Sequence, residues 1–245
     1  MRNALRSVGR FVFGRMMPRA AYPVVRGPLK GARFVLGAFA GAGGGATVYF
    51  NQLEPEQTAA MAAEIAPGSL VFDVGANAGY YTILASRLAG PDGRVVAFEP
   101  LERNLAYLQR HVEMNRAENV TVLASACSDV SGTATFEIGE NIAMGRLSDA
   151  APAGASVTVP TVTLDEIAER LGLTPDVIKL DVEGAEMAVL KGAGGIFERA
   201  KPTVFLSTHS NELRTECLAW LEARGYAATP LMGGDDPHEF LLKAR

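Results

Sequence analysis

The stretch Val71-Phe-Asp-Val-Gly75-Ala-Asn-Ala-Gly79-Tyr-Tyr-Thr-Ile-Leu-Ala85 decides how this chain is expected to fold. An apolar strand over 71–74 carries one carboxylate, Asp73, and runs through a turn bounded by Gly75 and Gly79 into an amphipathic helix. This order of elements is typical of an open parallel sheet that binds a nucleoside at its edge. Because glycine adopts φ values that a side chain forbids, the backbone of such a turn can approach a ligand closely.

The glycine turn differs from that of nicotinamide-dependent dehydrogenases. Those proteins use G-x-G-x-x-G and a helix N-terminus that receives a pyrophosphate. Here Asn77 replaces the second glycine, and Tyr80 stands where a further small residue is needed. The carboxylate of Asp73 repels phosphate oxygens and suits a ligand with cationic groups, such as the sulfonium and ammonium of S-adenosylmethionine. The alternative is a ligand-free tight turn in which Asp73 caps the helix.

A second acid, Glu99, follows the next expected strand, over 95–98, and lies 24 residues after Gly75. An acid at the end of the second strand, roughly 20 residues past the turn, is placed to accept hydrogen bonds from both ribose hydroxyls. Each such bond to a charged group contributes about 1.5–3 kcal/mol. The alternative is a surface acid that begins the helix at Leu101 and interacts with its dipole.

Composition limits the architecture and the class of partner. With 245 residues, 48% of them hydrophobic, the chain can form one α/β domain with a large core. A formal net charge of −4 and a pI near 5.5 argue against nucleic acid as the main partner. Cys127 and Cys217 lie 90 residues apart without metal-ligand spacing. We therefore expect a reducing, cytoplasmic setting with neither a disulfide framework nor a zinc site.

Charge is unevenly spread along the chain. Residues 1–53 hold eight basic residues and no acid, and Arg2, Arg6 and Arg10 recur every four residues beside an apolar helical face. This pattern predicts a basic helix that either contacts an anionic membrane surface peripherally or packs on the domain as a lid over the substrate. Arginines interrupt every apolar run, so no secretory signal is expected.

The stretch 34–53 is uncharged over 20 residues, which is long enough on paper to cross a bilayer. Glycines concentrated within 41–45 and a polar end favour instead a strand pair around a flexible loop. The glycine cluster lacks the Lys-Ser/Thr of a phosphate loop and is assigned no nucleotide role.

From residue 70 onward, buried strands alternate with helical patterns, which predicts a mostly parallel sheet covered by helices on both faces. The expected strands lie at 71–74, 95–98, 119–126, 176–180 and 202–206, with an antiparallel closing pair near 226–231 and 238–243, and the expected helices include 101–115 and 211–224. Thr163 and Glu166 form a capping-box pattern at the start of another helix. Alternating segments near 133–138 and 156–160 predict an inserted hairpin beside the site, whose loop helps to select the acceptor.

The segment Val177-Ile-Lys-Leu-Asp-Val-Glu-Gly-Ala-Glu-Met-Ala-Val-Leu-Lys191 carries the second group of charges. Strand alternation puts Lys179 and Asp181 on one face, and Asp181 falls at the carboxyl end, where ligands bind in such sheets. Both are candidate catalytic residues in a buried ion pair that shapes the site, and the alternative is a purely structural pair. Glu183 is placed to touch an acceptor or a metal, but two carboxylates do not require magnesium, so no metal is predicted. Glu186 is assigned only a favourable contact with the helix dipole.

His209 follows the fifth expected strand and so reaches the same edge of the sheet. A histidine can accept a hydroxyl proton near neutral pH, which makes His209 the first candidate for a catalytic base and Asp181 the second. The alternative is a hydrogen-bonded structural role. His111, on a helix, and His238, in a late turn, are expected to be structural or solvated.

Together these segments resemble the FkbM family of S-adenosylmethionine-dependent methyltransferases over about residues 47–243. The resemblance rests on Leu53-Glu-Pro-Glu56, Val71-Phe-Asp-Val-Gly-Ala-Asn-Ala-Gly-Tyr80, Ala97-Phe-Glu-Pro100 with Asn104, Ala126-Cys-Ser-Asp129, Val162-Thr-Leu-Asp165 and Ile178-Lys-Leu-Asp-Val-Glu-Gly-Ala-Glu186. It implies one Rossmann-like class I methyltransferase domain over 47–245, preceded by a basic N-terminal extension over 1–46 that comprises a helix and a glycine-rich loop. It also implies methylation of a hydroxyl on a sugar, glycolipid or polyketide-type small molecule.

The resemblance implies roles for single residues. The implied cofactor-binding residues are Glu54 at the methionine end, Asp73, Gly75, Asn77 and Gly79 around the methionine and ribose, Glu99 at the ribose hydroxyls with Asn104 from the same motif, and Ser128 and Asp129 near the adenine. Asp181 is implied to face the sulfonium and the acceptor. In one departure, Ser207-Thr-His209 stands where the family often has Glu-x-His. The missing acid weakens an acid–histidine or metal role for His209.

The implied reaction is in-line displacement, in which positioning of the reactants supplies about 7–11 kcal/mol of the barrier. Two rival functions remain: a non-catalytic cofactor- or membrane-binding module of the same fold, and a nicotinamide-dependent oxidoreductase, which Asp73 and the broken glycine spacing disfavour. We expect a cytoplasmic protein with a small-molecule or glycan acceptor and no nucleic-acid partner. A placement at the inner membrane face stays an option, and the sequence indicates neither the acceptor nor the oligomeric state.

Overall fold

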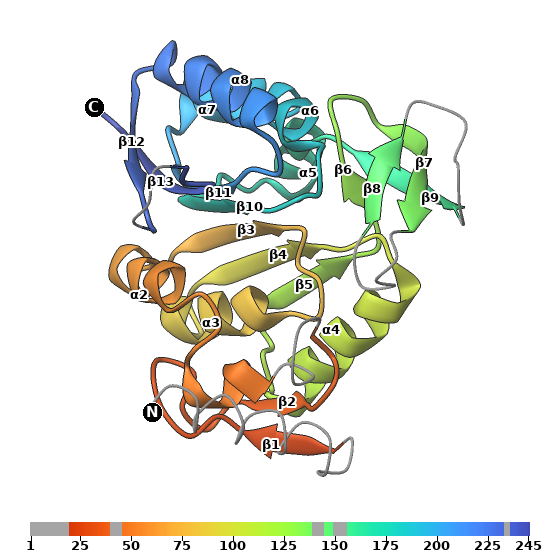
Figure 1. The fold of residues 1–245 in the computed structure, drawn as a ribbon, viewed down its shortest axis with the longest axis vertical. Helices are drawn as coiled ribbons and strands as arrows, with labels where there is room; N and C mark the ends of the chain where they lie inside the picture. Colours follow the sequence, from red (N-terminus) through yellow and green to blue (C-terminus); the bar gives the residue numbers. More distant parts are fainter. Residues whose placement is uncertain (1–19, 40–45, 139–144, 149–155, 233–235) are drawn as a thin grey trace.

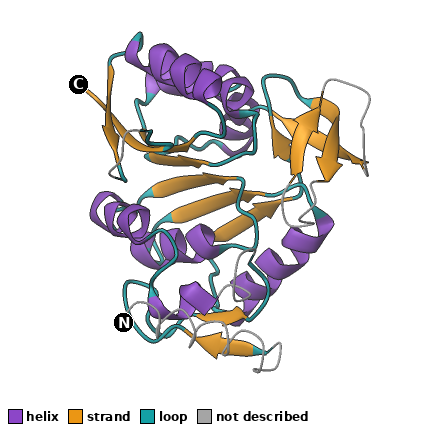
Figure 2. Ribbon diagram, viewed as in Figure 1, coloured by secondary structure: helices purple, strands orange, loops and turns teal. Residues whose placement is uncertain are grey.

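The computed structural model describes residues 20–39, 46–138, 145–148, 156–232 and 236–245, and its core is a seven-stranded sheet between two layers of helices (Figures 1 and 2). In spatial order the strands are β12 (Tyr226–Pro230), β13 (Glu239–Ala244), β11 (Thr203–Ser207), β10 (Val177–Leu180), β3 (Leu70–Val74), β4 (Arg94–Phe98) and β5 (Val120–Leu123). The strands from β11 to β5 are parallel, whereas β13 runs antiparallel to both of its neighbours. The predicted parallel, doubly wound sheet with an antiparallel closing strand is confirmed.

Helices cover both faces of this sheet (Figure 1). One layer contains α2 (Pro55–Glu64), α3 (Tyr80–Ala89) and α4 (Glu102–Met114), and the other contains α5 (Leu164–Leu171), α6 (Glu186–Lys191), α7 (Gly194–Arg199) and α8 (Asn211–Glu222). Successive residues of β3 alternate between the layers, since Val71 packs in the cluster that includes α3 and Phe72 in the cluster that includes α5 to α8. This two-sided burial explains why the core strands are apolar almost throughout.

A second sheet lies beside the main one (Figure 1). In spatial order its strands are β6 (Ala126–Cys127), β9 (Ser156–Val162), β7 (Gly132–Ile138) and β8 (Gly145–Ser148). The antiparallel pairing of β7 with β9 confirms the predicted hairpin. The single strand predicted over 119–126 is wrong, because β5 ends at Leu123 and Ala126 pairs in parallel with β9. Ala126 is buried against Phe136 and Val159, so its apolar side chain belongs to the small sheet.

Residues 20–39 form an N-terminal layer over α3 and α4. In it β1 (Ala21–Pro23) pairs antiparallel with β2 (Arg33–Val35), and the 3-10 helix η1 (Ala46–Phe50) follows later. The predicted strand pair across 34–53 is therefore wrong. Gly27 and Gly31, with φ values of 81° and 86°, reverse the chain earlier, so β2 pairs back to β1.

The basic helix and the 41–45 loop predicted from the sequence lie outside the described residues. The domain boundary at residue 46 stays a prediction, but Leu29 and Phe34 of the N-terminal layer are fully buried in the same cluster as α3. Within the described part of the chain, no helix is long and apolar enough to cross a membrane.

Helix α3 is buried on nearly every side rather than amphipathic, which corrects the sequence prediction. All residues from Tyr80 to Ser86 are buried, and this run covers almost two turns and so every direction around the helix. The main sheet covers one side of α3 and the N-terminal layer covers the other. Phe34 of that layer packs on Tyr80 with ring centroids 6.0 Å apart.

Both glycines of the turn after β3 are required by close packing within the protein. Gly75 and Gly79 have φ values of 81° and 89°. A Cβ atom on Gly75 would lie 1.9 Å from the carbonyl oxygen of Asp181, and one on Gly79 would lie 2.6 Å from Leu108 Cδ1. The turn therefore fits only because its two ends carry no side chain.

The N-cap predicted at Thr163 is confirmed, because its Oγ1 accepts the Glu166 amide at 3.1 Å. The reciprocal half of the capping box is wrong. The Thr163 N–H is donated to Ser131 Oγ at 3.1 Å, and the Ser131 hydroxyl donates to the Glu166 carboxylate. Ser131 is thus inserted between the two capping residues and ties the small sheet to α5.

His111 of α4 joins the N-terminal layer to the glycine turn and is structural, one of the two expected roles. The ring is fully buried, its Nε2 accepts the Val35 amide at 2.9 Å, and its Nδ1 donates to the Ala78 carbonyl at 2.6 Å. Because a backbone N–H can only donate, this pair of bonds requires the neutral ring protonated on Nδ1. Burial lowers the pKa of His111 from its ordinary 6.5 and so preserves that form.

We expect His111 to make folding stability fall in acid. The unfolded chain takes up a proton near pH 6.5 while the folded ring resists it, so this contribution is present above about pH 6.5 and is lost below it. Urea unfolding followed by circular dichroism should show the wild type losing its advantage over His111→Gln as pH decreases from about 7.5 to about 5.5. The control Asn115→Ala removes a non-titrating contact between the same layer and α4 and should keep the wild-type slope. Equal slopes for wild type and His111→Gln would contradict the expectation.

Candidate active site

A cavity of about 460 Å³ lies at the carboxyl ends of the central strands, within the size range of ligand pockets. The predicted site residues that line it are Glu54, Gly75, Asn77, Glu99, Asn104, Lys179, Asp181 and His209. Asp73 is fully buried beside this lining and joins it through Lys179. Gly79, Ser128 and Asp129 are not among the residues that line the cavity.

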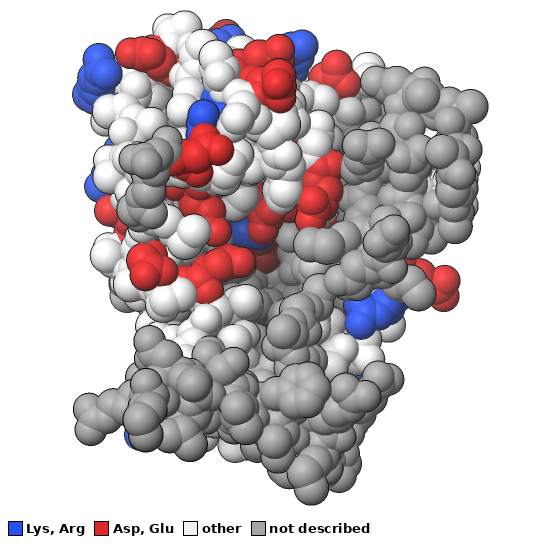
Figure 3. Space-filling model, viewed as in Figure 1, with Lys and Arg blue, Asp and Glu red and all other residues white. Residues whose placement is uncertain are grey.

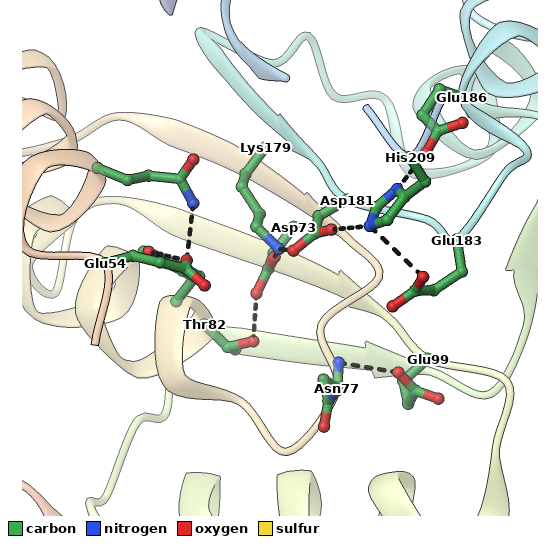
Figure 4. A network of polar contacts seen from close by, with 12 residues as sticks. Glu54, Asp73, Asn77, Thr82, Glu99, Lys179, Asp181, Glu183, Glu186 and His209 are labelled. Atoms are coloured by element: carbon green, nitrogen blue, oxygen red, sulfur yellow. Dashed lines mark hydrogen bonds and ion pairs between the residues drawn. The ribbon is translucent and has the colours of Figure 1, made fainter. Parts of the chain in front are cut away.

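An ion-pair chain links the two central strands at this end of the sheet (Figure 4). Asp73 of β3 and Lys179 of β10 are direct register partners, so both side chains emerge from the same face. The Lys179 ammonium donates to Asp181 Oδ2 at 3.0 Å and lies 3.9 Å from Asp73 Oδ1. Thr82 of α3 donates to Asp73 Oδ2 at 2.5 Å. The predicted ion pair of Lys179 and Asp181 is therefore present, although only Lys179 is buried and the Asp181 side chain is 31% exposed. Asp73 extends the pair.

The protonation states of the three residues in this ion-pair network depend on one another. Burial lowers the pKa of Lys179, but Asp181 and Asp73 outweigh it and leave the pKa raised. Burial raises the pKa of Asp181, but Lys179 outweighs it and leaves that pKa lowered. Burial raises the pKa of Asp73. Lys179 therefore stays an ammonium, also covered by the Tyr81 ring at 5.0 Å, and cannot act as a base.

Glu54 enters the cavity from the turn before α2. It is the N-cap of α2 with a left-handed φ of 39°, and its Oε2 accepts the Tyr81 hydroxyl at 2.6 Å and Gln57 Nε2 at 3.3 Å. Burial raises the pKa of Tyr81, so its hydroxyl remains a donor. The sequence analysis missed Tyr80 and Tyr81 as lining residues; their position directly after Gly79 was the available signal.

Glu99 is buried directly after β4 and accepts hydrogen bonds from both neighbouring turns. Its Oε2 accepts the Asn77 amide at 2.8 Å, and its Oε1 accepts the Leu101 amide at 2.9 Å and Asn104 Nδ2 at 3.4 Å. With 4% of its surface exposed, Glu99 is not the surface acid of the alternative, although it does cap the next helix. Burial raises its pKa against the opposing effect of these hydrogen bonds. Each carboxylate oxygen keeps further acceptor capacity for a ligand.

His209 forms a close pair with a buried acid (Figure 4). Its Nδ1 lies 2.5 Å from Oε1 of Glu186, a fully buried residue of α6. Its Nε2 lies 3.6 Å from Asp181 Oδ1 and 3.5 Å from Glu183 Oε2. The hydrogen bond that His209 donates to Glu186 is the largest cause of its raised pKa. With Glu186 on Nδ1, Nε2 is the ring atom left to exchange a proton with a ligand.

This pair corrects two sequence-based expectations. Glu186 was assigned only a helix-dipole contact, and Ser207 left His209 without an acid two residues before it. In the structure, α6 delivers the acid from 23 residues upstream. No local spacing rule indicates this contact, because it depends on how α6 packs beside the end of β11.

The segment after β5 contributes to the cavity through other residues than the sequence suggested. Ser128 Oγ donates to Asp129 Oδ1 at 3.1 Å, and Asp129 is exposed. The cavity is lined instead by Ser125, Ala126 and Cys127. Because Ala126 and Cys127 form β6 and pair with β9, this stretch belongs to the small sheet. Ser128 and Asp129, which follow β6, do not line the cavity.

No group of His, Cys, Asp or Glu side chains in the described ranges is arranged to hold a metal ion. Asp181 and Glu183 both approach His209 Nε2 instead. The chemistry that this part of the chain offers is proton transfer next to fixed carboxylates.

The strand order, with an acid near the end of β3, an acid directly after β4 and a cavity at their carboxyl ends, defines a class I methyltransferase fold. The sequence model of the protein family described as the methyltransferase FkbM domain matches residues 73–228. The chain therefore belongs to this family. S-adenosylmethionine is its cofactor. The residues fit that group, since the cavity has a suitable volume and carries the buried acceptor Glu99 and the acids Glu54 and Asp181.

Two curated relatives match parts of the chain. Hexuronic acid methyltransferase AglP of Haloferax volcanii is 33% identical over 125 residues, which are 50% of this chain and 49% of that protein. Ribosomal RNA small subunit methyltransferase G of Pseudarthrobacter chlorophenolicus is 30% identical over 138 residues, which are 56% and 57% of the two chains. The match thus spans only about half the length of these relatives.

Two solved structures share the fold. The FkbM methyltransferase of Methylobacillus flagellatus KT aligns with a TM-score of 0.52 at 17% identity, over 98% of this chain and 59% of that one. A putative rRNA methylase of Clostridium thermocellum aligns with a TM-score of 0.50 at 12% identity, over 78% and 95%. At these identities the similarity shows the architecture.

Glu186→Gln should lower the pKa of His209. The substitution removes the largest cause that raises it, while burial continues to favour the neutral ring. The measurement is an NMR titration of the imidazole signals, assigned by their absence in His209→Gln. The exposed Glu212→Gln is the matched control and should leave the titration unchanged, whereas an unchanged midpoint in Glu186→Gln would contradict the pairing.

Proposed function

We propose that the protein O-methylates a hydroxyl group of a sugar or of a related small molecule, and that His209 is the general base. The observation that carries the proposal is the His209–Glu186 pair, whose Nε2 is directed to the cavity next to Asp181. A base with one ring nitrogen held by a buried acid and the other at the cavity, beside the carboxylates of Asp181 and Glu183, is suited to take a hydroxyl proton.

Different residues of the cavity are proposed to contact the ribose and the methionine part of the cofactor. Glu99 accepts hydrogen bonds from the ribose hydroxyls, Glu54 faces the ammonium of the methionine part, and Gly75 and Asn77 lie alongside. When bound, S-adenosylmethionine supplies a methyl group that is already activated by its sulfonium. Asp181, kept ionised by Lys179, faces that cationic centre.

The remaining work of the chain is positioning and proton removal. Holding the acceptor hydroxyl in line can contribute about 7–11 kcal/mol to lowering the barrier. His209 Nε2 takes the hydroxyl proton, and Glu186 stabilises the imidazolium that results. General-base catalysis of this kind adds about 10²–10⁴-fold in rate.

The charge of the cavity and one of the two relatives support a small, non-nucleic-acid acceptor. The Haloferax volcanii relative is named for a sugar derivative, and the other for ribosomal RNA. Binding to RNA depends on cationic contacts to phosphates, whereas acids dominate the lining of this cavity. Glycolipid and polyketide-type acceptors remain within the proposal. Peripheral membrane contact and the cytoplasmic placement stay predictions from the sequence.

Glu99→Gln should weaken the binding of S-adenosylhomocysteine. It removes the charge from an acceptor of two ribose hydroxyls, where each charged hydrogen bond contributes about 1.5–3 kcal/mol, so a loss of about 10- to 100-fold is expected. Isothermal calorimetry measures it, with the exposed Glu222→Gln as control. Wild-type affinity in Glu99→Gln would remove Glu99 from the cofactor site.

His209→Gln should slow methyl transfer by about 10²–10⁴-fold while S-adenosylhomocysteine affinity changes little. The assay supplies labelled S-adenosylmethionine and a metabolite extract of the source cells, and mass spectrometry identifies products that have gained one methyl group. His238→Gln, at the other histidine of the cavity, is the matched control and should retain most of the activity. Equal rates in wild type and His209→Gln would assign the base elsewhere, and products methylated on RNA would contradict the acceptor class.

A further inference from the structure

One side of the cavity is an acidic wall formed by Glu54, Asp181, Glu183 and Glu239. Acidic side chains gather in the middle of this face of the molecule, with few basic ones among them (Figure 3). The described lining contains no arginine, and its lysine, Lys179, already contacts Asp181 and Asp73. An anionic ligand at this wall therefore meets several carboxylates and no uncommitted ammonium or guanidinium in the described lining.

Glu239 occupies a defined place in this wall. It is the first residue of β13 and the direct antiparallel partner of Ser207 at the end of β11. Directly opposed residues in an antiparallel pair project from the same face, with Cβ atoms about 4.5–5.5 Å apart. Glu239 thus brings a carboxylate from the neighbouring strand to the position opposite Ser207, and both residues line the cavity.

The Glu239 carboxylate has one buried oxygen that no described residue satisfies. Its Oε2 is shielded from solvent and has no hydrogen-bond partner among the described residues. A buried, unsatisfied carboxylate oxygen is costly unless a ligand donates to it. Burial raises the pKa of Glu239 to about 7, and the negative charges of Glu54 and Asp181 add to the effect. The side chain is therefore ready either to donate to a neutral hydroxyl or, when ionised, to accept from a cation.

We propose that Glu239 contacts the acceptor and selects hydroxyl acceptors whose adjoining groups are neutral or cationic over those that carry an anion beside the methylated hydroxyl. The inference rests on the proposed function, because it places the acceptor beside Asp181 in this cavity. Polyols and amino sugars donate hydrogen bonds to the acidic wall, whereas a carboxylate or phosphate is repelled by it. A uronic acid is thus disfavoured as acceptor.

The test compares three probes that share one ring: methyl glucosaminide, methyl glucoside and methyl glucuronide. Each is titrated into protein saturated with S-adenosylhomocysteine, and ligand-observed NMR gives the dissociation constant. We expect the cationic amino glycoside to bind most tightly, about tenfold or more tighter than the uronide, because like charges at an interface oppose binding.

Variants locate the preference at Glu239. Glu239→Gln should reduce the amino-to-uronide affinity ratio about threefold or more, since one charge leaves the wall. The double variant Ser207→Glu/Glu239→Gln should restore the ratio, because it returns a carboxylate to the opposed position on β11. Glu222→Gln, on an exposed residue paired with Arg245 far from the lining, should keep the wild-type ratio. Circular dichroism confirms that each variant is folded.

Two results would overturn the inference. One is a wild type that binds the uronide as tightly as the amino glycoside, or that binds all three probes equally or undetectably. The other is a folded Glu239→Gln protein with an unchanged ratio. Failure of the proposed function is separate, because O-methylated products from an extract report methyl transfer whatever the charge of the acceptor.

Discussion

The structure depends on the buried ammonium of Lys179, held between Asp73 and Asp181 where β3 and β10 end side by side. Charges withdrawn from water are costly, and removing one partner of such a pair typically costs about 3–5 kcal/mol. The register of the two strands therefore cannot slip without stranding a charge. The same contact keeps Asp181 ionised at the edge of the cavity, so one interaction serves both the sheet and the site.

The cavity is built from acids that differ in how they are held. Glu99 is fixed by backbone amides of two turns, whereas Glu186 is fixed by the imidazole of His209. Both are buried, which strengthens their interactions because the local dielectric is low. Glu186 and Glu239 each keep one buried oxygen without a hydrogen-bond partner among the described residues, but only Glu239 lines the cavity. A ligand in the cavity can therefore satisfy the free oxygen of Glu239 and not that of Glu186.

The sequence predicted the fold, and eight of the twelve residues that it assigned to the site line the cavity. The strand-turn-helix around Asp73, the acid at Glu99 and the histidine at the end of β11 follow local rules of period and spacing, and all three emerge at the carboxyl ends of the strands. The extent of β5 and the partner of β2 were wrong, because an edge strand and a short strand carry too little pattern to fix their pairing. Ser128 and Asp129, predicted to lie near the adenine, are not among the residues that line the cavity, and their role stays a prediction.

By itself the sequence determined the layered sheet, its closing antiparallel strand and the acids after its first two strands, because alternation, glycine positions and strand-end residues are local properties. Only the tertiary structure decided which acid forms a hydrogen bond with His209 and which strand places a carboxylate opposite Ser207. Glu186 and Glu239 lie 23 and 32 residues from the positions they serve. Their contacts arise from the packing of α6 and the register of β13, which no local pattern encodes.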